Sequence, residues 1–317
     1  MTAILLLLLL LGCSATVDAV VYDLVKPLRE FPMVLSHDAA TSMLNAKLKV
    51  VGSYTQTQAD GDLASQLDCG ARAYDYRPYL KKDGTLIAHH GSMKVNAEMR
   101  GSLQGIIEWL AQPAHSDELV LLYVSHCLSD GDKDTQEPRC VDAAAALLSD
   151  MGVSTIRGDC SPLSSLTVGD ALSRGKLPSG GSLLAVFDCT NENFVESVNC
   201  WGVQGIHEYC CYGENKEIAW ASLTSYLNST ASPLATPADN LWMLQAHWQS
   251  TAVSVPLGDL HRSSVLQDER RAGVNLWLAQ MLRARALPYK TLSLVELDNV
   301  CDNGLEVLAA LQENYYA

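Results

Sequence analysis

Short apolar runs alternate along the chain with stretches in which apolar residues recur at helical spacing. The helical spacing predicts helices within residues 103–110, 141–148 and 265–287. Strands that alternate with helices favour a parallel sheet with crossover connections. The apolar runs of strand length predict strands at residues 31–35, 71–76, 85–89, 119–124, 183–187, 241–246 and 292–297.

The organisation of the chain indicates one domain. A length of 317 residues fits either two domains or one large barrel, but no linker or low-complexity tract divides residues 20–317. No glycine-rich dinucleotide fingerprint follows the first predicted strand, which disfavours an open, doubly wound sheet. The pattern therefore predicts an α/β fold with a closed (β/α) barrel of the TIM type, as a single domain over residues 20–317.

The N-terminal segment predicts export. Residues 4–11 form an apolar run that is too short to cross a bilayer, which needs about 20 residues. The run matches the apolar part of a secretory signal, with small residues at possible cleavage points after Ala15 or Ala19. We predict a signal peptide at residues 1–19 and a secreted, extracellular mature protein. Residues 11–13 also resemble a bacterial lipoprotein cleavage site, and that alternative stays open.

Cysteine usage agrees with an oxidising compartment. Nine of the 10 cysteines follow residue 19, and none has the spacing of a zinc site. Cys127 and Cys140 bracket a polar loop and predict one disulfide, while the cysteines at 189, 200, 210 and 211 are expected to staple another loop. We expect at least three bridges among the nine. Asn228 begins the one N-x-S/T sequon, as in a glycoprotein.

Composition and charge exclude several classes. With 48% hydrophobic and 18% charged residues, the chain can build a packed core and is not a disordered protein. The formal charge of -14 repels phosphate backbones, so no nucleic-acid partner is expected. It also gives no attraction to an anionic membrane, so any contact with a membrane surface should be transient, local and apolar.

Candidate functional residues gather where the predicted strands end, which is where barrels place their sites. Asp75 and Arg77 are two residues apart, so in a strand they point to the same face. Two histidines, two aspartates and an arginine at the first three strand ends are hard to explain as packing, because buried charge is costly unless it is paired. Polar residues at the later strand ends are His126, Asp188, His247 with Trp248, and Asp298.

Three segments carry a resemblance to a known family. They are residues 35–41 (LSHDAAT), 66–77 (QLDCGARAYDYR) and 89–91 (HHG). In this order and spacing they resemble the X-domain signature of the phosphatidylinositol-specific phospholipases C. Residues 166–170 and 175–187 are similar to later parts of the family pattern, so the resemblance covers most of residues 31–300. It implies a single distorted (β/α)8 TIM-type barrel and phosphodiester cleavage by general acid–base chemistry.

The resemblance also implies catalytic roles that suit the residue types. A phosphodiester attacked by a neighbouring hydroxyl needs a base, an acid and a cation for the phosphoryl oxygens. His37 is expected to be the base and His90 the acid, since imidazole titrates near neutral pH. Arg77 offers a planar fork that matches phosphate. His89 stays open as an alternative acid, although the His-Gly pattern selects His90.

Three carboxylates complete the predicted catalytic set, and no metal is expected. Asp38 and Asp75 are expected to orient and charge-balance the His90 and Arg77 side, and Asp298 to lie beside His37. Calcium-dependent relatives carry an acidic residue at the Arg77 position, where a guanidinium would repel a cation. The resemblance is therefore to the metal-independent branch, with no cofactor.

The substrate is less sharply defined than the chemistry. The candidate substrate-binding residues are His126, Asp188, His247 and Trp248. Where inositol-lipid-cleaving members place basic residues, this chain has His126 and Asp188, so recognition of inositol stays open. The leading hypothesis is a phosphoric diester hydrolase of the phospholipase C type, acting on a phospholipid or inositol phosphodiester.

Two other hypotheses stay open. One is another phosphodiesterase on the same barrel, of the glycerophosphodiesterase or sphingomyelinase-D type. Those enzymes carry paired metal-binding carboxylates on the second strand, and Arg77 argues against them. The other is a non-catalytic binding protein that has kept the barrel. The intact set of His37, Arg77 and His90 argues against that hypothesis, whereas the replaced head-group positions favour it.

Overall fold

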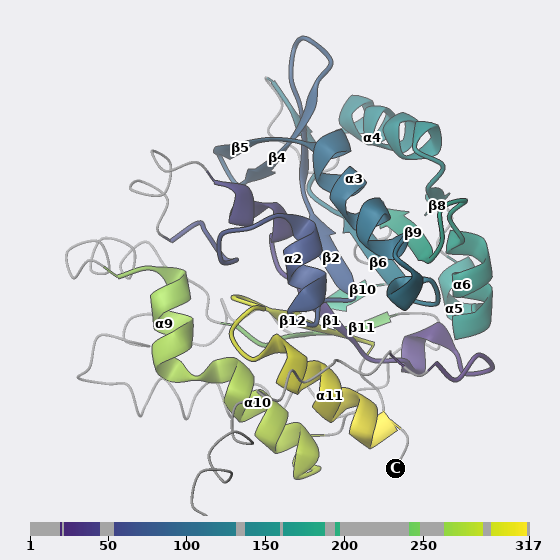
Figure 1. Cartoon of the computed structure of the whole chain (residues 1–317). Helices are drawn as coiled ribbons and strands as arrows, with labels where there is room; N and C mark the ends of the chain where they lie inside the picture. The colour runs from purple at the N-terminus through teal and green to yellow at the C-terminus, as the bar shows by residue number, and fades with distance from the viewer. Residues whose placement is uncertain are drawn as a thin grey trace, which may run out of the picture.

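The structure is a computed structural model that describes residues 20, 22–44, 54–130, 137–158, 161–187, 194–196, 241–247, 263–287 and 293–315. Its centre is an eight-stranded sheet in which every pairing is parallel (Figure 1). From edge to edge the strands are β10 (Phe194–Glu196), β11 (Leu241–Gln245), β12 (Leu294–Leu297), β1 (Met33–Ser36), β2 (Ala73–Tyr76), β6 (Leu119–Val124), β9 (Ser182–Phe187) and β8 (Ser154–Ile156).

This sheet confirms the α/β prediction, and six predicted strands lie on it as β1, β2, β6, β9, β11 and β12. Every residue of β1, β2, β6, β9 and β12 is buried, as expected where helices cover a parallel sheet. Within the described residues the ladder ends at β10 and β8, and β8 lies outside β9, out of chain order. The ladder therefore does not close among the described strands, and closure into a barrel stays a prediction.

The prediction for residues 85–89 is wrong in one respect. These residues form a strand, β4 (Leu86–His90), but it belongs to a second sheet of four strands, in the order β5 (Met93–Glu98), β4, β3 (Pro78–Leu80) and β7 (Leu128–Ser129). β4 runs antiparallel to β3. The link between them is a tight turn closed by Gly84, whose φ is +86°. A parallel crossover needs about a dozen residues or more, and this link is far shorter.

The helices surround the sheet (Figure 1). Two predicted helices are confirmed, within α3 (Met99–Leu110) and α4 (Pro138–Asp150). The predicted helix at 265–287 is two helices, α9 (Val265–Ala272) and α10 (Val274–Arg283), because Gly273 takes a left-handed conformation between them. The others are α2 (Leu63–Asp68), α5 (Pro162–Ser165), α6 (Val168–Gly175) and α11 (Gly304–Tyr315), with 3-10 turns η1 (Leu28–Glu30), η2 (Ala39–Met43) and η3 (Pro113–His115).

A buried ion pair links the starts of the neighbouring strands β2 and β6. The guanidinium of Arg72 donates to both oxygens of Glu118, at 3.0 and 3.2 Å. The hydroxyl of Tyr22 donates to the same carboxylate at 2.7 Å, so the N-terminal segment is anchored there. This end of the sheet is opposite the strand ends that carry the candidate chemistry, and it serves stability.

Two disulfides are present among the described residues. Cys127–Cys140 is the predicted bridge, and Cys69–Cys301 joins the end of α2 to the segment between β12 and α11. Cysteines 13, 160, 189, 200, 210 and 211 lie outside the described residues, as do residues 1–19 and Asn228. None of the described helices is long and apolar enough to cross a bilayer.

Candidate active site

The strand ends of β1 and β12 are tied together directly beneath the site. The carbonyl of His37 accepts hydrogen bonds from Thr57 Oγ1 at 2.9 Å and from Gln58 Nε2 at 3.0 Å. Gln58 Nε2 also donates to the carbonyl of Leu297 at 2.9 Å. Gln58 therefore fixes His37 against the neighbouring strand. No sequence pattern points to this glutamine, because it lies on a segment between strands.

The ring of His37 is held at both nitrogens. Nδ1 lies 2.7 Å from Asp298 Oδ1, and Nε2 lies 3.2 Å from Asp38 Oδ2. The register of β1 against β12 pairs Ser36 with Leu297, which brings the residues that follow them side by side. Burial by itself lowers the pKa of His37, but Asp38 and the other nearby carboxylates outweigh it and raise the pKa above its ordinary value. A protonated ring can donate to both carboxylates at once.

Asp38 is the centre of the cluster. Its Oδ2 lies 3.2 Å from Nε2 of His37 and 3.2 Å from Nε2 of His90, and its Oδ1 lies 2.7 Å from Nε of Arg77. Burial alone would raise the pKa of Asp38, but Arg77, His90 and His37 lower it below the ordinary value. The backbone of Asp38 is left-handed, with φ 43°, a conformation that aspartate tolerates better than most residues.

Asp75 and Arg77 share one face, as predicted, and bind each other. Arg77 contacts Asp75 Oδ2 through Nε at 2.9 Å and a terminal nitrogen at 2.7 Å. Ser125 Oγ donates to Asp75 Oδ1 at 2.5 Å. Despite burial, Arg77 lowers the pKa of Asp75, and Asp38 and Asp75 raise the pKa of Arg77. The guanidinium is therefore a permanent cation, pinned between two carboxylates.

The two adjacent histidines of β4 point to opposite sides, as alternation in a strand requires. His90 faces Asp38 through Nε2, and its Nδ1 lies 2.9 Å from the carbonyl of Thr55. The ring of His89 instead contacts the carbonyls of His126, at 2.7 Å, and Gly91, at 3.0 Å. Burial lowers the pKa of His89. Of the two candidates for the acid, His90 is the one that joins the cluster.

The later strand ends contribute residues of different kinds. His126 follows β6 with φ 48°, and its Nδ1 lies 3.1 Å from Ser125 Oγ. His247 is completely buried behind His37, with the ring planes 15° apart and the centroids separated by 4.2 Å. Its Nε2 lies 3.1 Å from Glu296 Oε2. Asp188 and Trp248, the other predicted substrate-binding residues, lie outside the described residues.

Glu296 is a second residue of the site, besides Gln58, that was not among the predicted site residues. It lies in β12 two residues before Asp298, so both side chains leave the strand on the same face. That spacing is the signal that would have found it. Together the described cluster holds four buried carboxylates, from Asp38, Asp75, Glu296 and Asp298, around Arg77 and three imidazoles.

The geometry of the cluster does not favour a metal site. Within the part of the chain that the structure describes, two sets of three residues have candidate ligand atoms within 4.8 Å of one another, and both include His37. In the set with His247 and Asp298, the stacked rings direct their in-plane nitrogens side by side rather than toward one point, unlike a tetrahedral centre. A calcium ion needs six to eight oxygen ligands, whereas Arg77 already occupies the oxygens of Asp38 and Asp75. The absence of a metal cofactor stays a prediction.

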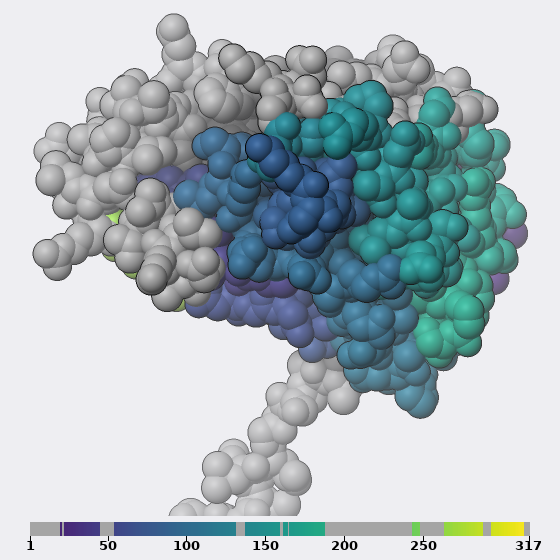
Figure 2. Space-filling view, turned by 90° about the horizontal axis from the view of Figure 1, so that it is seen from above, coloured from purple at the N-terminus to yellow at the C-terminus, as the bar shows by residue number. Residues whose placement is uncertain are grey.

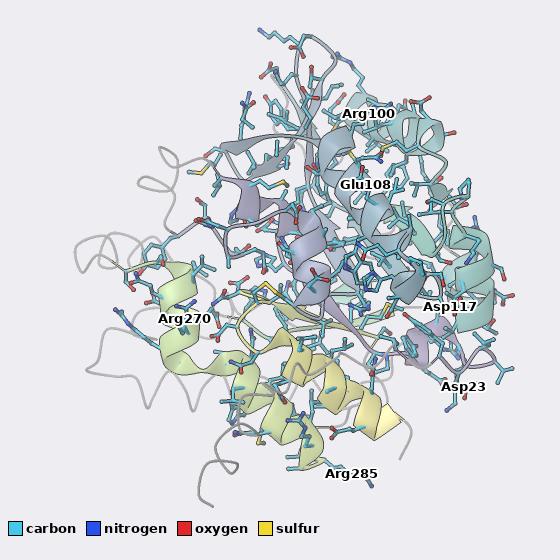
Figure 3. The ribbon with its side chains drawn as sticks, in the orientation of Figure 1. Asp23, Arg100, Glu108, Asp117, Arg270 and Arg285 are labelled. Atoms are coloured by element: carbon cyan, nitrogen blue, oxygen red, sulfur yellow. A yellow bond between two sulfur atoms is a disulfide. The ribbon has the colours of Figure 1, made fainter. Side chains whose placement is uncertain are left out.

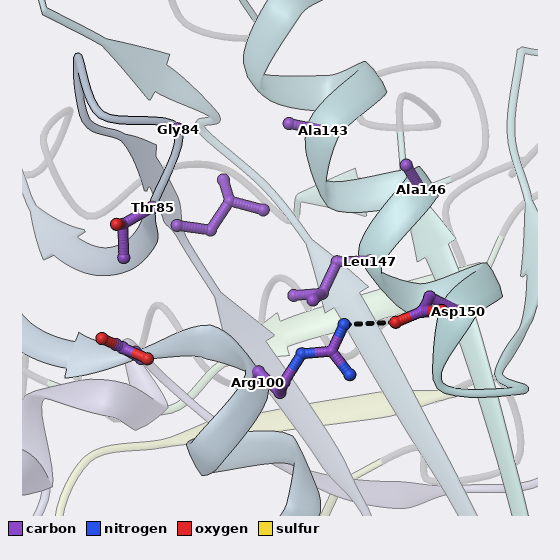
Figure 4. Close-up of a pocket in the computed structure, with 9 residues that line it drawn as sticks. Gly84, Thr85, Arg100, Ala143, Ala146, Leu147 and Asp150 are labelled. Atoms are coloured by element: carbon purple, nitrogen blue, oxygen red, sulfur yellow. Dashed lines mark hydrogen bonds and ion pairs between the residues drawn. The ribbon is translucent and has the colours of Figure 1, made fainter.

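A separate pocket of about 490 Å³ lies between the β3–β4 turn and the helices α3 and α4. Figure 2, seen from above, shows the blue residues of this segment beside the teal residues of α4. Ala143 and Leu147 form part of its apolar wall, and an ion pair between Arg100 and Asp150 crosses its edge (Figure 4). None of the clustered histidines or carboxylates lines it, so it is distinct from the candidate active site.

The cluster brings several charged side chains together below the surface. Charged side chains such as Arg100, Asp117 and Arg285 lie at the periphery (Figure 3). The cluster is buried, yet the side chains of His90 and Arg77 remain 25% and 17% exposed. A small ligand can therefore approach the acid candidate and the guanidinium from outside.

Comparisons with known proteins agree on the fold. No protein-family model and no curated protein matches the sequence. A phosphatidylinositol-specific phospholipase C from Listeria monocytogenes matches the structure with a TM-score of 0.58 and 14% identity, covering 94% of this chain and 97% of that chain. A mutant of the corresponding enzyme from Staphylococcus aureus matches with a TM-score of 0.56 and 15% identity, over 90% of this chain and 94% of that chain.

A third match is a Staphylococcus aureus structure described for modulation of membrane binding. Its TM-score is 0.52 and its identity 16%, again over 90% of this chain and 94% of that chain. These matches extend over nearly the whole chain, and they confirm at the level of the fold the resemblance carried by the three sequence segments. The chain has the fold of the bacterial phosphatidylinositol-specific phospholipases C.

Proposed function

We propose that this protein is a secreted phosphodiesterase of the phospholipase C type that cleaves a phospholipid or inositol phosphodiester. The observation that supports this most strongly is the convergence of His37 Nε2 and His90 Nε2 on one oxygen of Asp38, beside Arg77. Each imidazole is fixed by its other nitrogen, so the two reactive nitrogens face a common point. Phosphodiester cleavage by an internal hydroxyl needs this arrangement of acid, base and cation.

In the proposed reaction, a hydroxyl on the substrate next to the phosphate attacks phosphorus. His37 takes the proton of that hydroxyl, the bond from phosphorus to the leaving oxygen breaks, and His90 gives the leaving oxygen a proton. The products are a cyclic phosphodiester and a free alcohol. Water can then open the ring with the two imidazoles in exchanged roles, which makes the overall reaction a hydrolysis.

The surrounding residues support these steps. Asp298 accepts from Nδ1 of His37, so a neutral ring keeps its lone pair on Nε2, where the attacking hydroxyl arrives. Both histidine contacts with Asp38 Oδ2, at 3.2 Å, are ion-pair contacts without hydrogen-bond geometry, so a substrate oxygen can replace them. Arg77, pinned by Asp75, supplies positive charge to the phosphoryl oxygens. We propose that this guanidinium takes the place of a metal ion.

The proposed substrate class follows from the structural neighbours, which are phosphatidylinositol-specific phospholipases C. His126 lies beside the cluster through Ser125 and is proposed to contact the head group. Transient contact with a lipid surface is part of the same proposal. Export, with removal of residues 1–19, is supported by the two disulfides. We propose one domain over residues 20–317.

The test is turnover of phospholipid vesicles that contain phosphatidylinositol, with phosphatidylcholine and phosphatidylethanolamine vesicles as comparisons. His37→Ala and His90→Ala should each lose about 100- to 10,000-fold in rate while keeping a cooperative thermal transition. His115→Ala is the matched control, because His115 stacks on Trp109 away from the cluster. Undiminished turnover in either site variant would refute its role, and no turnover of any phosphodiester by the wild type would favour a binding protein.

A further inference from the structure

We propose that His247 is held as an imidazolium between Glu296 and Asp298, and that its charge, stacked on the ring of His37, keeps His37 ready to accept a proton. This makes His247 a positioning residue rather than one that contacts substrate. The proposal rests on the proposed function, in which His37 is the base. It also gives a role to Glu296, which the proposed reaction does not otherwise use.

The first support is the placement of the ring. His247 follows β11, Glu296 lies in β12 and His37 follows β1, and these three strands are neighbours in the sheet. The side chain of His247 is 0% exposed, so a substrate that enters beside Arg77 cannot reach it. The face of its ring instead packs on the ring of His37, with 4.2 Å between the centroids.

The second support is the charge around His247. Its Nε2 lies 3.1 Å from Glu296 Oε2, and its Nδ1 lies 3.9 Å from Asp298 Oδ2. Both carboxylates are almost completely buried. Burial favours the neutral form of an imidazole, whereas a carboxylate beside each nitrogen favours the protonated form, and the proposal takes the two carboxylates to prevail. Packing alone would be served better by an apolar side chain, since a buried ion pair must offset the desolvation of both partners.

The third support is the set of groups that face His37. Asp38 and Asp298 hold its two nitrogens, Arg77 and Asp75 lie beyond Asp38, and the ring of His90 is 6.4 Å away. Burial lowers the pKa of His37, Asp38 raises it, His247 lowers it, and Glu296 and Asp298 raise it. Among the described residues, therefore, His247 is the stacked cation that opposes the carboxylates. Without it, His37 would hold its proton to higher pH and act poorly as a base.

The size of the effect follows from the ring separation. Two unit charges 4.2 Å apart interact strongly enough to shift a titration by between about 1 and 3 pH units, for effective dielectric constants from about 80 down to about 20. The His247→Gln variant removes the charge and keeps a donor toward Glu296. His37 should then titrate higher by about 1 pH unit or more, and the acidic limb of the kcat/KM profile should move to higher pH by the same amount.

The decisive experiment is an NMR titration of the His37 ring in histidine-labelled full-length mature protein. Wild type, His247→Gln and His247→Gln/Glu296→Gln are compared. The single variant should raise the titration midpoint of His37. The double variant should bring it back toward the wild-type value, because removing the Glu296 carboxylate favours the neutral ring. An unchanged midpoint in the single variant, or a further rise in the double variant, would overturn the proposal.

The readout separates this proposal from the proposed function. The ring of His37 titrates whether or not the protein turns over a phosphodiester, so inactivity refutes only the proposed function. If His247→Gln fails to fold, His247→Phe/Glu296→Leu replaces the pair with apolar groups and leaves no buried charge unpaired. In that variant the two opposing effects on His37 cancel in part, so its midpoint should differ from wild type by less than about 1 pH unit. A larger shift would contradict the proposed balance.

Discussion

The disulfide between Cys69 and Cys301 should contribute more stability than the one between Cys127 and Cys140. The perturbation is the paired replacement Cys69→Ser/Cys301→Ser, with Cys127→Ser/Cys140→Ser as the matched comparison. Both bridges join segments that the structure describes. Cys69 caps the end of α2, and Cys301 follows Asp298 by three residues.

The magnitude follows from loop length. A disulfide removes chain entropy from the unfolded state, and the loss grows with the logarithm of the number of residues enclosed. The Cys69–Cys301 bridge spans a sequence separation of 232, and the Cys127–Cys140 bridge spans 13. At 25 °C these separations correspond to about 5 kcal/mol and about 3 kcal/mol of stabilisation, respectively.

The local packing gives the longer bridge a second effect. Gly70 and Gly304 bring the end of α2 against the start of α11, and a Cβ on Gly304 would lie 2.7 Å from the carbonyl oxygen of Cys69. The bridge therefore fixes a contact in which the two backbones touch. Since the same segment carries Asp298, removal of the bridge should also lower turnover, through loss of the hold on His37.

The assay is urea unfolding of both variants and the wild type, with reversibility checked by dilution. The Cys69→Ser/Cys301→Ser variant should lose about 2 kcal/mol more than the comparison variant, from the difference between the two loop lengths. Equal losses, or a larger loss in the Cys127→Ser/Cys140→Ser variant, would refute the reasoning from loop entropy.

Three further predictions concern the charged cluster. Arg77→Lys keeps the charge but loses the planar fork, so kcat should fall about 100-fold. Turnover by the wild type should be unaffected by chelator, and a dependence on added calcium would contradict the role of Arg77. The profile of kcat/KM against pH should be bell-shaped. Because the pKa of His37 is raised, the midpoint of the acidic limb should lie above the ordinary histidine pKa of about 6.5, and a midpoint below that value would contradict the assignment of His37 as the base. Asp38 and Asp75 have lowered pKa values, so the stability they contribute is present above about pH 4 and lost as pH falls further. Asp38→Asn should therefore weaken the dependence of the free energy of unfolding on pH in acid, and an unchanged dependence would count against the ion pairs.

The sequence located the candidate site residues correctly where charged side chains follow a recognisable apolar run. His37 with Asp38, and Asp75 with Arg77, could be placed at strand ends because a fully buried strand reads as an apolar run. Alternation within a strand then predicted that Asp75 and Arg77 share a face, and the structure brings them into contact. His90 could be preferred over His89 from the segment pattern, and their opposite orientations on β4 agree with that preference.

The pattern failed where pairing depends on distant segments. Residues 85–89 looked like the next barrel strand, whereas the Asp83-Gly84 turn folds them back onto β3. The strands β8 and β10 have three residues each, too few for a recognisable run. The pairing of Cys69 with Cys301 cannot be derived from spacing, because it depends on where the last barrel strand returns.

The environment of His247 shows the same limit. A histidine at a strand end predicts exposure toward substrate, and only the register of β11, β12 and β1 places it behind His37 instead. Glu296 was overlooked because it lies inside an apolar strand rather than at its end. A second carboxylate on the inward face of the last strand is the signal to look for in similar chains.

The most direct test of the proposed chemistry is the identity of the first phosphorus-containing product. Phosphatidylinositol vesicles are treated with wild-type protein in excess chelator, and the soluble products are followed by ³¹P NMR. A cyclic inositol phosphodiester should appear before any acyclic phosphate, and it should be absent with His37→Ala. An acyclic phosphate formed from the start, or a requirement for added metal, would contradict attack by the neighbouring hydroxyl with His37 as base and Arg77 as the cation.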